Sequence, residues 1–489
     1  MTQLHSELSD VFCHNANVVA VARPRNQDVT YQALGGMIAN VQSLIATRAP
    51  KAVGILGTRS LEAYVAVMAC FFSGVRFVPL NPELPNERLD KIIRYGQVDL
   101  LLHDGKRNDI DSFASGFSSD IAEVAAGEDT SDKPVLSKKL QASDIAYQMF
   151  TSGSTGEPKG VPITYGSLSH YVSGIRATTG HDTGGRFSQL FDLSFDLSMH
   201  DIFVALASGG TLVPASNIDL MMPHSYIQKK CIDYWFSVPL VASVALRGLG
   251  DNPVKHKLKK AMFCGEQLPT EYATGFRAFV EPDGPIYNLY GPTEATIAFT
   301  AKHFKDADPD LAVVPLGEPF GENVIGIRTH EGEVVEADEG AEGELLLGGP
   351  QVFSGYYPDN SVECFVGEDP RYYCSGDLVR VKNGELHHIG RIDSQIKLRG
   401  YRIELGDIEA AFRKAFGCAA AAAVVLGTGE SREIVLAYEH TKNIDDFSLL
   451  DAHLPAYMRP AQFMRFEKIP TNINGKVDRK TIGKMQWAL

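Results

Sequence analysis

Hydrophobic and polar positions alternate along the first third of the chain with two different periods. Residues 30–45 and 61–72 repeat their apolar side chains at helical spacing, and residues 52–56 form a short continuous apolar run that is typical of a buried strand. The same pattern returns with a strand at residues 145–150 and a helix at residues 167–178. Helices and buried strands that follow one another in this way predict a layered α/β architecture.

The pattern changes from about residue 315 onward. Short apolar runs bounded by turn residues, such as 343–349 and 384–390, predict a β-rich subdomain. Residues 390–409 are rich in glycine and charge, which indicates a hinge before a compact C-terminal unit. We therefore expect a large N-terminal domain of residues 1–392 and a small, mobile α+β domain of residues 393–489.

Two stretches are interpreted as structural only. Residues 106–140 are rich in Asp, Ser, Gly and Lys, and we predict a variable surface connection there. Residues 419–425 are nearly all alanine and valine, and a buried strand of the small domain explains them best.

Composition and charge exclude several classes of protein. A chain of 489 residues with 44% hydrophobic content is too long for a single core, and a net charge of −14 argues against nucleic acid as a partner. Seven scattered cysteines without a Cys-x-x-Cys pair fit reduced thiols. The N-terminus has no signal-peptide pattern, and no apolar run reaches the roughly 18 residues of a membrane helix. We expect a cytoplasmic monomer that does not contact membranes.

A loop rich in hydroxyls and glycines follows the predicted strand at 145–150. It consists of Thr151, Ser152, Gly153, Ser154, Thr155 and Gly156, followed by Lys159. The glycines expose backbone N–H groups, while the hydroxyls and the lysine add donors and positive charge, as a triphosphate requires. No Gly-Lys-Ser/Thr sequence closes the loop, so a P-loop nucleoside triphosphatase is disfavoured. A flexible Ser/Gly surface loop is the alternative.

Six further motifs follow in a fixed order along nearly the whole chain. They lie at residues 191–201, 263–266, 288–296, 373–377, 390–409 and 474–476. Together with the loop at 151–160 they resemble the adenylate-forming superfamily, which contains acyl-CoA synthetases, luciferases and the adenylation domains of nonribosomal peptide synthesis.

The resemblance implies an ATP site that is spread over these motifs. Tyr290 would stack on adenine, and Asp377 would accept hydrogen bonds from the ribose hydroxyls. The other residues implied to contact ATP or AMP are Thr151, Ser152, Gly153, Ser154, Thr155, Gly156, Lys159, Gly265, Glu266, Asn288, Gly291 and Arg391. Ordinary surface turns are the alternative interpretation of Tyr290 and Asp377.

Three residues are implied to act in catalysis. Thr293 would contact the α-phosphate, and Glu294 would help to hold Mg²⁺, which prefers hard oxygen ligands and bridges substrate phosphates. Lys476 would be delivered by the small domain to neutralise the negative charge of the substrate carboxylate and the α-phosphate. ATP and Mg²⁺ are the implied cofactors.

The implied reaction has two halves. A carboxylate attacks the α-phosphorus of ATP and releases pyrophosphate, and a thiol then attacks the acyl carbon and releases AMP. Rotation of the small domain about Asp393 would exchange Lys476 for the face bearing Arg399 and Gly400, which would line a pantetheine tunnel. The chain ends at residue 489 without a carrier domain, so we expect the thiol on a separate carrier protein, with CoA as the alternative.

Asp196 indicates which kind of acid is activated. In the amino-acid-activating members an Asp at this place holds the α-ammonium group of the substrate, a strong charge-assisted pair. A helix N-cap is the alternative interpretation. The other residues implied to wall the substrate pocket are Leu197, His200, Phe236, Met262, Cys264, Leu289, Ile297 and Ala298.

The size of these side chains predicts a small and mostly apolar pocket. We expect a small neutral amino acid, with D-alanine, glycine or L-alanine favoured and proline next. The set resembles D-alanine:carrier-protein ligases and also prolyl-adenylating enzymes. His200 departs from both, and either bonds a polar substrate side chain or only packs. Cys264 has no evident base beside it, so we interpret it as a wall residue and not a nucleophile.

Two alternative functions are kept. One is an acyl- or aryl-CoA ligase, which would not need Asp196. The other is a binding-only relative that senses a nucleotide or an amino acid, and it is disfavoured because Thr151, Lys159, Glu294, Asp377 and Lys476 are all present.

Overall fold

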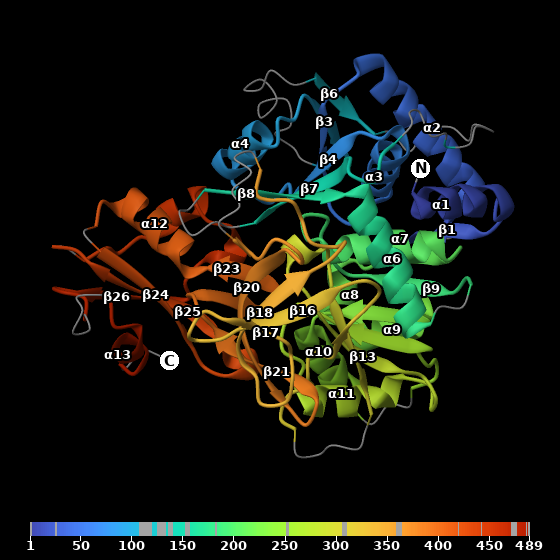
Figure 1. Cartoon of the computed structure of the whole chain (residues 1–489). Coiled ribbons are helices and arrows are strands. Elements are labelled where there is room, and N and C mark those ends of the chain that lie inside the picture. Colours follow the sequence, from blue (N-terminus) through green and yellow to red (C-terminus); the bar gives the residue numbers. More distant parts are fainter. Residues whose placement is uncertain are drawn as a thin grey trace. The chain divides into compact units, whose positions relative to one another are not determined.

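The structure is a computed structural model, and it divides into two compact units (Figure 1). It describes residues 2–24, 27–106, 120–124, 134, 140–151, 157–180, 183–250, 254–305, 311–357, 364–418, 420–441, 443–470, 477–485 and 487. The first unit contains Met1–Pro82, Gly96–Met149 and Gly160–Ile392, and the second contains Glu83–Tyr95, Phe150–Lys159 and Asp393–Leu489. The functional boundary predicted after residue 392 stays a prediction.

A six-stranded sheet contains the first long strands of the chain. Its order is β6-β5-β3-β4-β7-β8, with β3 (Ala52–Leu56), β4 (Arg76–Leu80), β5 (Leu100–His103), β6 (Asp120–Glu123), β7 (Ile145–Thr151) and β8 (Lys159–Thr164). The pairs of β3 with β4 and β5, of β4 with β7 and of β5 with β6 are parallel. Parallel sheets are covered on both faces, which explains why β3 is buried along its whole length.

The helix α3 (Leu61–Ser73) is apolar all round and almost completely buried, as a helix between two layers must be. It begins at Ser60, whose hydroxyl accepts the N–H of Ala63, and ends at Gly74 in the left-handed conformation. The helices that pack beside it are α1 (Gln3–His14) and α2 (Tyr31–Arg48), while α4 (Asn86–Tyr95) belongs to the second unit.

A nine-stranded sheet forms the second layer. Its order is β15-β14-β13-β12-β11-β9-β10-β1-β2, with β1 (Val19–Val21), β2 (Val29–Thr30), β9 (Arg186–Gln189), β10 (Thr211–Pro214), β11 (Tyr234–Ser237), β12 (Lys260–Phe263), β13 (Ile286–Tyr290), β14 (Thr300–Phe304) and β15 (Glu318–Pro319). The strands from β1 through β13 in this order are parallel, and the edges are antiparallel. Its helices are α6 (Tyr165–Thr179), α7 (Leu197–Ala207), α8 (Asn217–Met221), α9 (Pro223–Lys230), α10 (Pro239–Leu249) and α11 (Thr270–Phe276).

One continuous hydrophobic core joins the two sheets through the helices between them. Phe71 of α3 and Phe203 of α7 meet with ring centroids 4.9 Å apart, and both belong to the cluster that contains Phe77 and Tyr147 of the first sheet. A second cluster, which includes Trp235, Phe263 and other residues of the second sheet and of α9 to α11, covers the opposite face.

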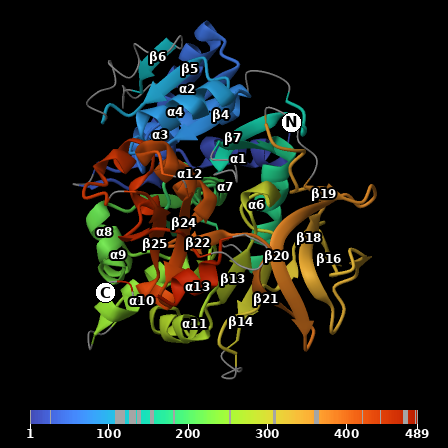
Figure 2. The ribbon, with the colours of Figure 1, turned by 90° about the vertical axis from the view of Figure 1, so that its left-hand side faces the viewer.

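A third, antiparallel sheet contains β16 (Val324–Arg328), β17 (Val334–Val335), β18 (Glu342–Gly348), β19 (Phe365–Val366), β20 (Tyr372–Lys382) and β21 (Glu385–Arg391), and Figure 2 shows β16, β18, β20 and β21 side by side. This is the predicted β-rich subdomain. It begins later than residue 315, because β15 at Glu318–Pro319 pairs with β14 and so belongs to the second sheet.

The second unit holds two small sheets. The hairpin of β22 (Gln395–Leu398) and β23 (Tyr401–Glu404) is followed by α12 (Leu405–Phe416), by the sheet β24-β25-β26 and by α13 (Arg479–Gly483). The strands of that sheet are β24 (Ala420–Leu426), β25 (Glu433–Glu439) and β26 (Gln462–Phe466). The alanine-rich β24 is largely buried, as the sequence predicts.

The predicted helices and strands are confirmed with small shifts of their ends. The strand β6 lies inside the stretch that was interpreted as a surface connection, so that interpretation missed it. No helix of the described part of the chain is long and apolar enough to cross a bilayer.

Candidate active site

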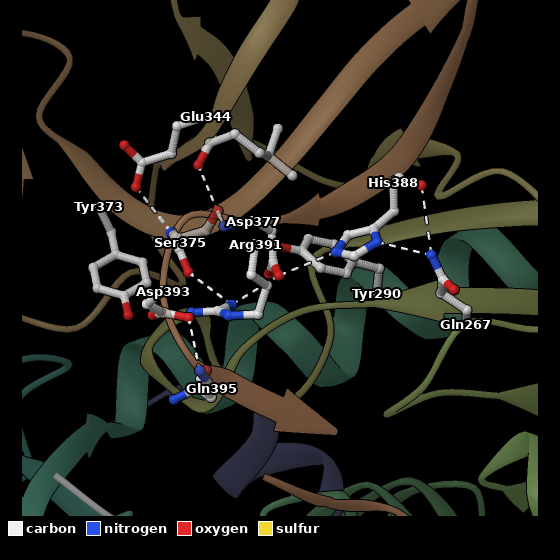
Figure 3. Close-up of polar contacts among 12 residues, drawn as sticks. Gln267, Tyr290, Glu344, Tyr373, Ser375, Asp377, His388, Arg391, Asp393 and Gln395 are labelled. Atoms are coloured by element: carbon white, nitrogen blue, oxygen red, sulfur yellow. Dashed lines mark hydrogen bonds and ion pairs between the residues drawn. The ribbon is translucent and has the colours of Figure 1, made fainter. Parts of the chain in front are cut away.

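The buried carboxylate of Asp377 is the centre of a polar cluster (Figure 3). Asp377 lies on β20 directly opposite Arg391 on β21, and the Arg391 guanidinium donates to Asp377 Oδ1 at 2.7 Å. The hydroxyl of Tyr290 donates to Asp377 Oδ2, also at 2.7 Å. Since Tyr290 ends β13, this cluster joins the second sheet to the third. Three residues that the sequence assigns to the nucleotide are therefore neighbours.

Tyr290 acts as a neutral donor in this cluster. Burial, and then the adjacent Asp377 carboxylate, raise the pKa of Tyr290 well above its usual range. Its ring is 5% exposed, so the phenol is held in place by packing and by its hydrogen bond. The stacking of this ring on adenine stays a prediction.

Two further residues of the cluster were not predicted. His388 Nε2 lies 3.2 Å from Asp377 Oδ1, and Gln267 Nε2 lies 2.9 Å from His388 Nδ1. A shift in the pairing of β20 and β21 opposes Leu378 to Gly390 but Val379 to His388, so Ile389 is an extra residue. This bulge brings His388 and Arg391 to the same carboxylate although they are three positions apart, which a regular strand does not allow.

The residues predicted to line the base follow β12 and lie on β13. Asn288 on β13 is 2% exposed, and its amide donates to the carbonyls of Val314 and Pro315 at 3.2 and 2.8 Å. Gly265 follows β12 with φ +95°, and an added Cβ would lie 3.2 Å from Val238. The positive φ explains why glycine stands there. Glu266 and Gly291 follow the same two strands.

Asp196 stands directly before α7, but its side chain makes no capping hydrogen bond to this helix. The residue is 8% exposed, and Oδ2 has no hydrogen-bond partner among the described residues. Burial raises the pKa of Asp196 to about 6, and the charge of Glu294 acts in the same direction, while the Thr293 hydroxyl lowers it. Asp196 therefore occupies the N-cap position without a capping bond from its side chain, and its buried Oδ2 is left for another donor.

The predicted wall residues lie together in the main hydrophobic core. Phe236 on β11 pairs with Met262 on β12. The other apolar members that the structure places in this cluster are Leu197, Cys264, Leu289, Ile297 and Ala298. Cys264 is completely buried, as a wall residue should be.

His200 of α7 is buried and neutral. Its Nδ1 lies 2.7 Å from the hydroxyl of Tyr171, and its ring centroid lies 4.1 Å from that of Phe236. Burial, assisted by the charge of Lys260, lowers the pKa of His200 to about 3. Its ring therefore fills space beside Phe236 within the predicted pocket set.

A short turn after β13 carries the predicted catalytic pair Thr293 and Glu294. The turn η3 (Thr293–Ala295) is followed by Thr296 and Ile297, both left-handed at φ +58° and +71°. Such backbone costs about 1–3 kcal/mol for each β-branched residue and is concentrated at functional sites.

Glu294 is completely buried, and its carboxylate accepts a hydrogen bond from a neighbouring hydroxyl. Tyr356 donates to Glu294 Oε1 at 2.7 Å, and the N–H of Phe353 donates to the Glu294 carbonyl at 2.9 Å. An oxygen ligand fixed in this way suits a hard cation such as Mg²⁺.

Several predicted residues are placed by the structure only in part. Residues 152–156 of the phosphate loop and Lys476 lie outside the described residues. Thr151 ends β7 and Lys159 begins β8, so they bound the loop. In the second unit, Asp393 Oδ1 accepts the N–H of Gln395 at 3.1 Å. Arg399 and Gly400 form the two-residue turn of the β22–β23 hairpin, both with positive φ.

Comparison with known proteins gives a family. The model of the AMP-binding enzyme family matches residues 12–357, which is more than half of the chain. The D-alanine–D-alanyl carrier protein ligase of Staphylococcus epidermidis is 31% identical over 503 residues, which cover 99% of each protein. A linear gramicidin synthase of Brevibacillus parabrevis is 32% identical over 450 residues, which cover 88% of this chain and 6% of that relative.

A solved structure agrees with these relatives. The Vibrio cholerae adenylation domain AlmE, solved in complex with glycyl-adenosine-5'-phosphate, has a TM-score of 0.88 and 28% identity, covering 99% of this chain and 97% of that one. The chain therefore belongs to the AMP-binding enzyme family, as an adenylating ligase of the kind that includes D-alanine–carrier protein ligases and nonribosomal adenylation domains.

Proposed function

We propose that this enzyme activates a small neutral amino acid with ATP and transfers it to the phosphopantetheine thiol of a separate carrier protein. D-alanine, glycine and L-alanine are the favoured substrates, and proline is the next. The observation that carries the proposal is the buried Asp196 carboxylate, whose Oδ2 has no donor among the described residues.

An amino acid substrate supplies what this carboxylate lacks. A buried charge is costly unless a partner compensates it, and the α-ammonium group offers both a positive charge and three N–H donors. A fatty or aryl acid offers neither. Asp196 therefore favours amino acids over the acids of CoA ligases.

The volume left for the substrate side chain is small. The rings of His200 and Phe236 pack against one another at a tilt of 41°, and Met262, Leu289 and Ile297 are all larger than alanine and buried. The relative in Staphylococcus epidermidis is a D-alanine ligase, and AlmE holds a glycyl-adenylate, which supports the same size class.

The nucleotide would bind with its ribose at Asp377 and its base at Tyr290. Asp377 accepts bonds from Tyr290, Arg391 and His388 and is therefore held rigidly before ligand binds. Glu294 would hold Mg²⁺, which neutralises the charge of the phosphates. No three His, Cys, Asp or Glu side chains of the described residues form a metal site, so phosphate oxygens and waters would complete the coordination.

Lys476 would complete the first half-reaction by neutralising the charge on the carboxylate and the α-phosphate. Rotation about Asp393 would then remove it and bring the hairpin turn of Arg399 and Gly400 to the pantetheine path. This alternation explains how one site serves two chemistries.

The test is amino-acid-dependent ATP–pyrophosphate exchange with the proteinogenic amino acids, D-alanine, β-alanine, fatty acids and aryl acids. We expect exchange with small amino acids, and a loss of about 100-fold or more in kcat/KM with Asp196→Asn, since breaking a buried ion pair costs about 3–5 kcal/mol. Asp192→Asn is the matched control, because Asp192 belongs to the same motif and its carboxylate accepts hydrogen bonds from Ser194 of its own turn. Exchange with fatty acids alone would overturn the proposal.

A further inference from the structure

Gln351 is a completely buried amide that lies outside the motifs from which the site is predicted. It follows β18 and lies against the turn that carries Thr293 and Glu294. Its Nε2 donates to the carbonyls of Ala295, Thr296 and Ala298, at 3.1, 3.2 and 2.7 Å. The Thr296 hydroxyl donates in return to the Gln351 carbonyl at 2.6 Å. Four hydrogen bonds thus tie one side chain and its backbone to one turn.

This turn needs support from outside. Thr296 and Ile297 are both β-branched and both left-handed, a conformation that persists only where the surrounding structure enforces it. Buried carbonyls also need donors, and the two N–H groups of Gln351 serve three of them.

The orientation of the Gln351 amide is fixed by two side chains that donate hydrogen bonds to its oxygen. The N–H of Glu322 donates to His170 Nε2 at 3.0 Å, so His170 carries its proton on Nδ1. His170 Nδ1 then donates to Gln351 Oε1 at 3.1 Å, and Asn323 Nδ2 donates to the same oxygen at 2.9 Å. Two donors hold the oxygen, and the amide nitrogen must therefore face the turn.

The turn that Gln351 holds also shapes the predicted substrate site. Ile297 and Ala298 are wall residues, and the Thr293 hydroxyl and the Ile297 N–H both bond Asp196. A displacement of the turn would move two walls of the pocket and two donors of the carboxylate together, while the contacts of Asp377 with Tyr290 and Arg391 involve none of these atoms.

We propose that Gln351 is a positioning residue for the acid substrate, which it serves by holding the Ala295–Ala298 carbonyls so that Ile297, Ala298 and Thr293 keep their places around Asp196. The inference rests on the proposed function in so far as Asp196 binds the substrate. It adds Gln351, which follows β18 and lies outside the motifs from which the site is predicted, to the determinants of substrate affinity.

The test compares the two Michaelis constants in ATP–pyrophosphate exchange, measured with whichever acid supports the fastest exchange by the unaltered enzyme. Gln351→Met keeps the length of the side chain and removes its donors, and Gln351→Glu keeps the acceptor for His170 and Asn323. We expect both to raise KM for the acid about tenfold and KM for ATP by a clearly smaller factor, since Thr293 and Glu294 of the same turn are also predicted to contact the α-phosphate and Mg²⁺. His170→Leu, which removes one donor to Gln351, should raise KM for the acid less and in the same direction.

Gln42→Met is the control for a buried glutamine, since Gln42 lies on α2 and contributes to no part of the predicted site. It should change neither Michaelis constant. Gln351 variants that lower only kcat would overturn the proposal, because a loss of folded enzyme lowers the apparent kcat alone. Variants that raise KM for the acid and KM for ATP by the same factor would also overturn it. Exchange with a fatty acid instead of an amino acid would overturn the proposed function, while the two Michaelis constants would still test the role of Gln351.

Discussion

The Asp196 carboxylate has to be ionised to bind an ammonium group, and its environment opposes ionisation. Burial and the neighbouring Glu294 raise its pKa to about 6, so protonation of the free enzyme begins close to neutral pH. A ligand that brings a positive charge favours the ionised form, so substrate binding and deprotonation are coupled.

We predict an acidic limb in the pH profile of kcat/KM for the amino acid. The free enzyme is competent only with Asp196 ionised, so kcat/KM should be constant at higher pH and fall about tenfold per unit below a pKa near 6. The measurement is ATP–pyrophosphate exchange at subsaturating amino acid. A limb near the ordinary Asp value of 3.8 would contradict the role of burial.

His200 is predicted to lie in the substrate pocket, and its two interpretations, packing or hydrogen bonding to a substrate side chain, can be separated by experiment. If it only fills space beside Phe236, His200→Ala should raise kcat/KM for larger amino acids relative to alanine by about tenfold or more, since each methylene in such a pocket is worth about 1–3 kcal/mol. Tyr171→Phe removes the bond to Nδ1 and preserves volume, so it should leave selectivity unchanged. A change of selectivity with Tyr171→Phe would show instead that His200 presents an N–H to the substrate.

The bulge of β21 is the local feature that completes the polar cluster around Asp377. An extra residue at Ile389 turns His388 toward Asp377 beside Arg391, so the carboxylate gains a third donor. Gln267 supports the other side of the imidazole, at 2.9 Å from Nδ1. One inserted residue thus changes which side chains reach the site.

We predict that His388→Ala raises KM for ATP about tenfold and leaves KM for the amino acid unchanged, because it removes a bond to a buried charge. The control is His387→Ala, since His387 lies next to His388 on β21 but is paired with Arg380 of β20 and not with Asp377. Equal effects of the two variants on KM for ATP would show that the strand, and not the His388 contact, matters.

The spacing of apolar residues was enough to predict several of the helices and buried strands, among them α3 and β3, because these are apolar in a way that only an internal layer allows. Motif order indicated Asp196, Tyr290, Asp377 and Arg391, three of which prove to be direct neighbours. His388 and Gln351 were missed for a physical reason. A bulge breaks the period of two, and a buried glutamine shows its purpose only when the carbonyls that it meets are known.

The two half-reactions make different demands on the whole chain. In the proposed cycle the first would need Lys476 and the second would need its removal, so a restriction at Asp393 should affect only one of them. The Asp393 side chain accepts a hydrogen bond from the N–H of Gln395 at 3.1 Å. A proline at position 393 would remove this bond and would restrict rotation of the backbone by fixing φ.

We predict that Asp393→Pro retains ATP–pyrophosphate exchange but loses acylation of a phosphopantetheinylated carrier protein. Asp393→Ala, which leaves the backbone free, should retain both activities. The readouts are exchange and loading of radiolabelled amino acid onto the carrier. Equal loss of both activities in the proline variant would contradict a hinge at this position.

The cluster around Asp377 has a thermodynamic consequence. Tyr290 belongs to the nine-stranded sheet, whereas Asp377 and Arg391 belong to the third sheet, so a nucleotide that contacts all three fastens one sheet to the other. Binding at about 100 times Kd adds about 2.7 kcal/mol to the stability of whatever must open to release the ligand. ATP would then slow amide hydrogen exchange in β13, β20 and β21 together. At a high ATP concentration the contact between the two sheets would stay closed whether or not an amino acid is present.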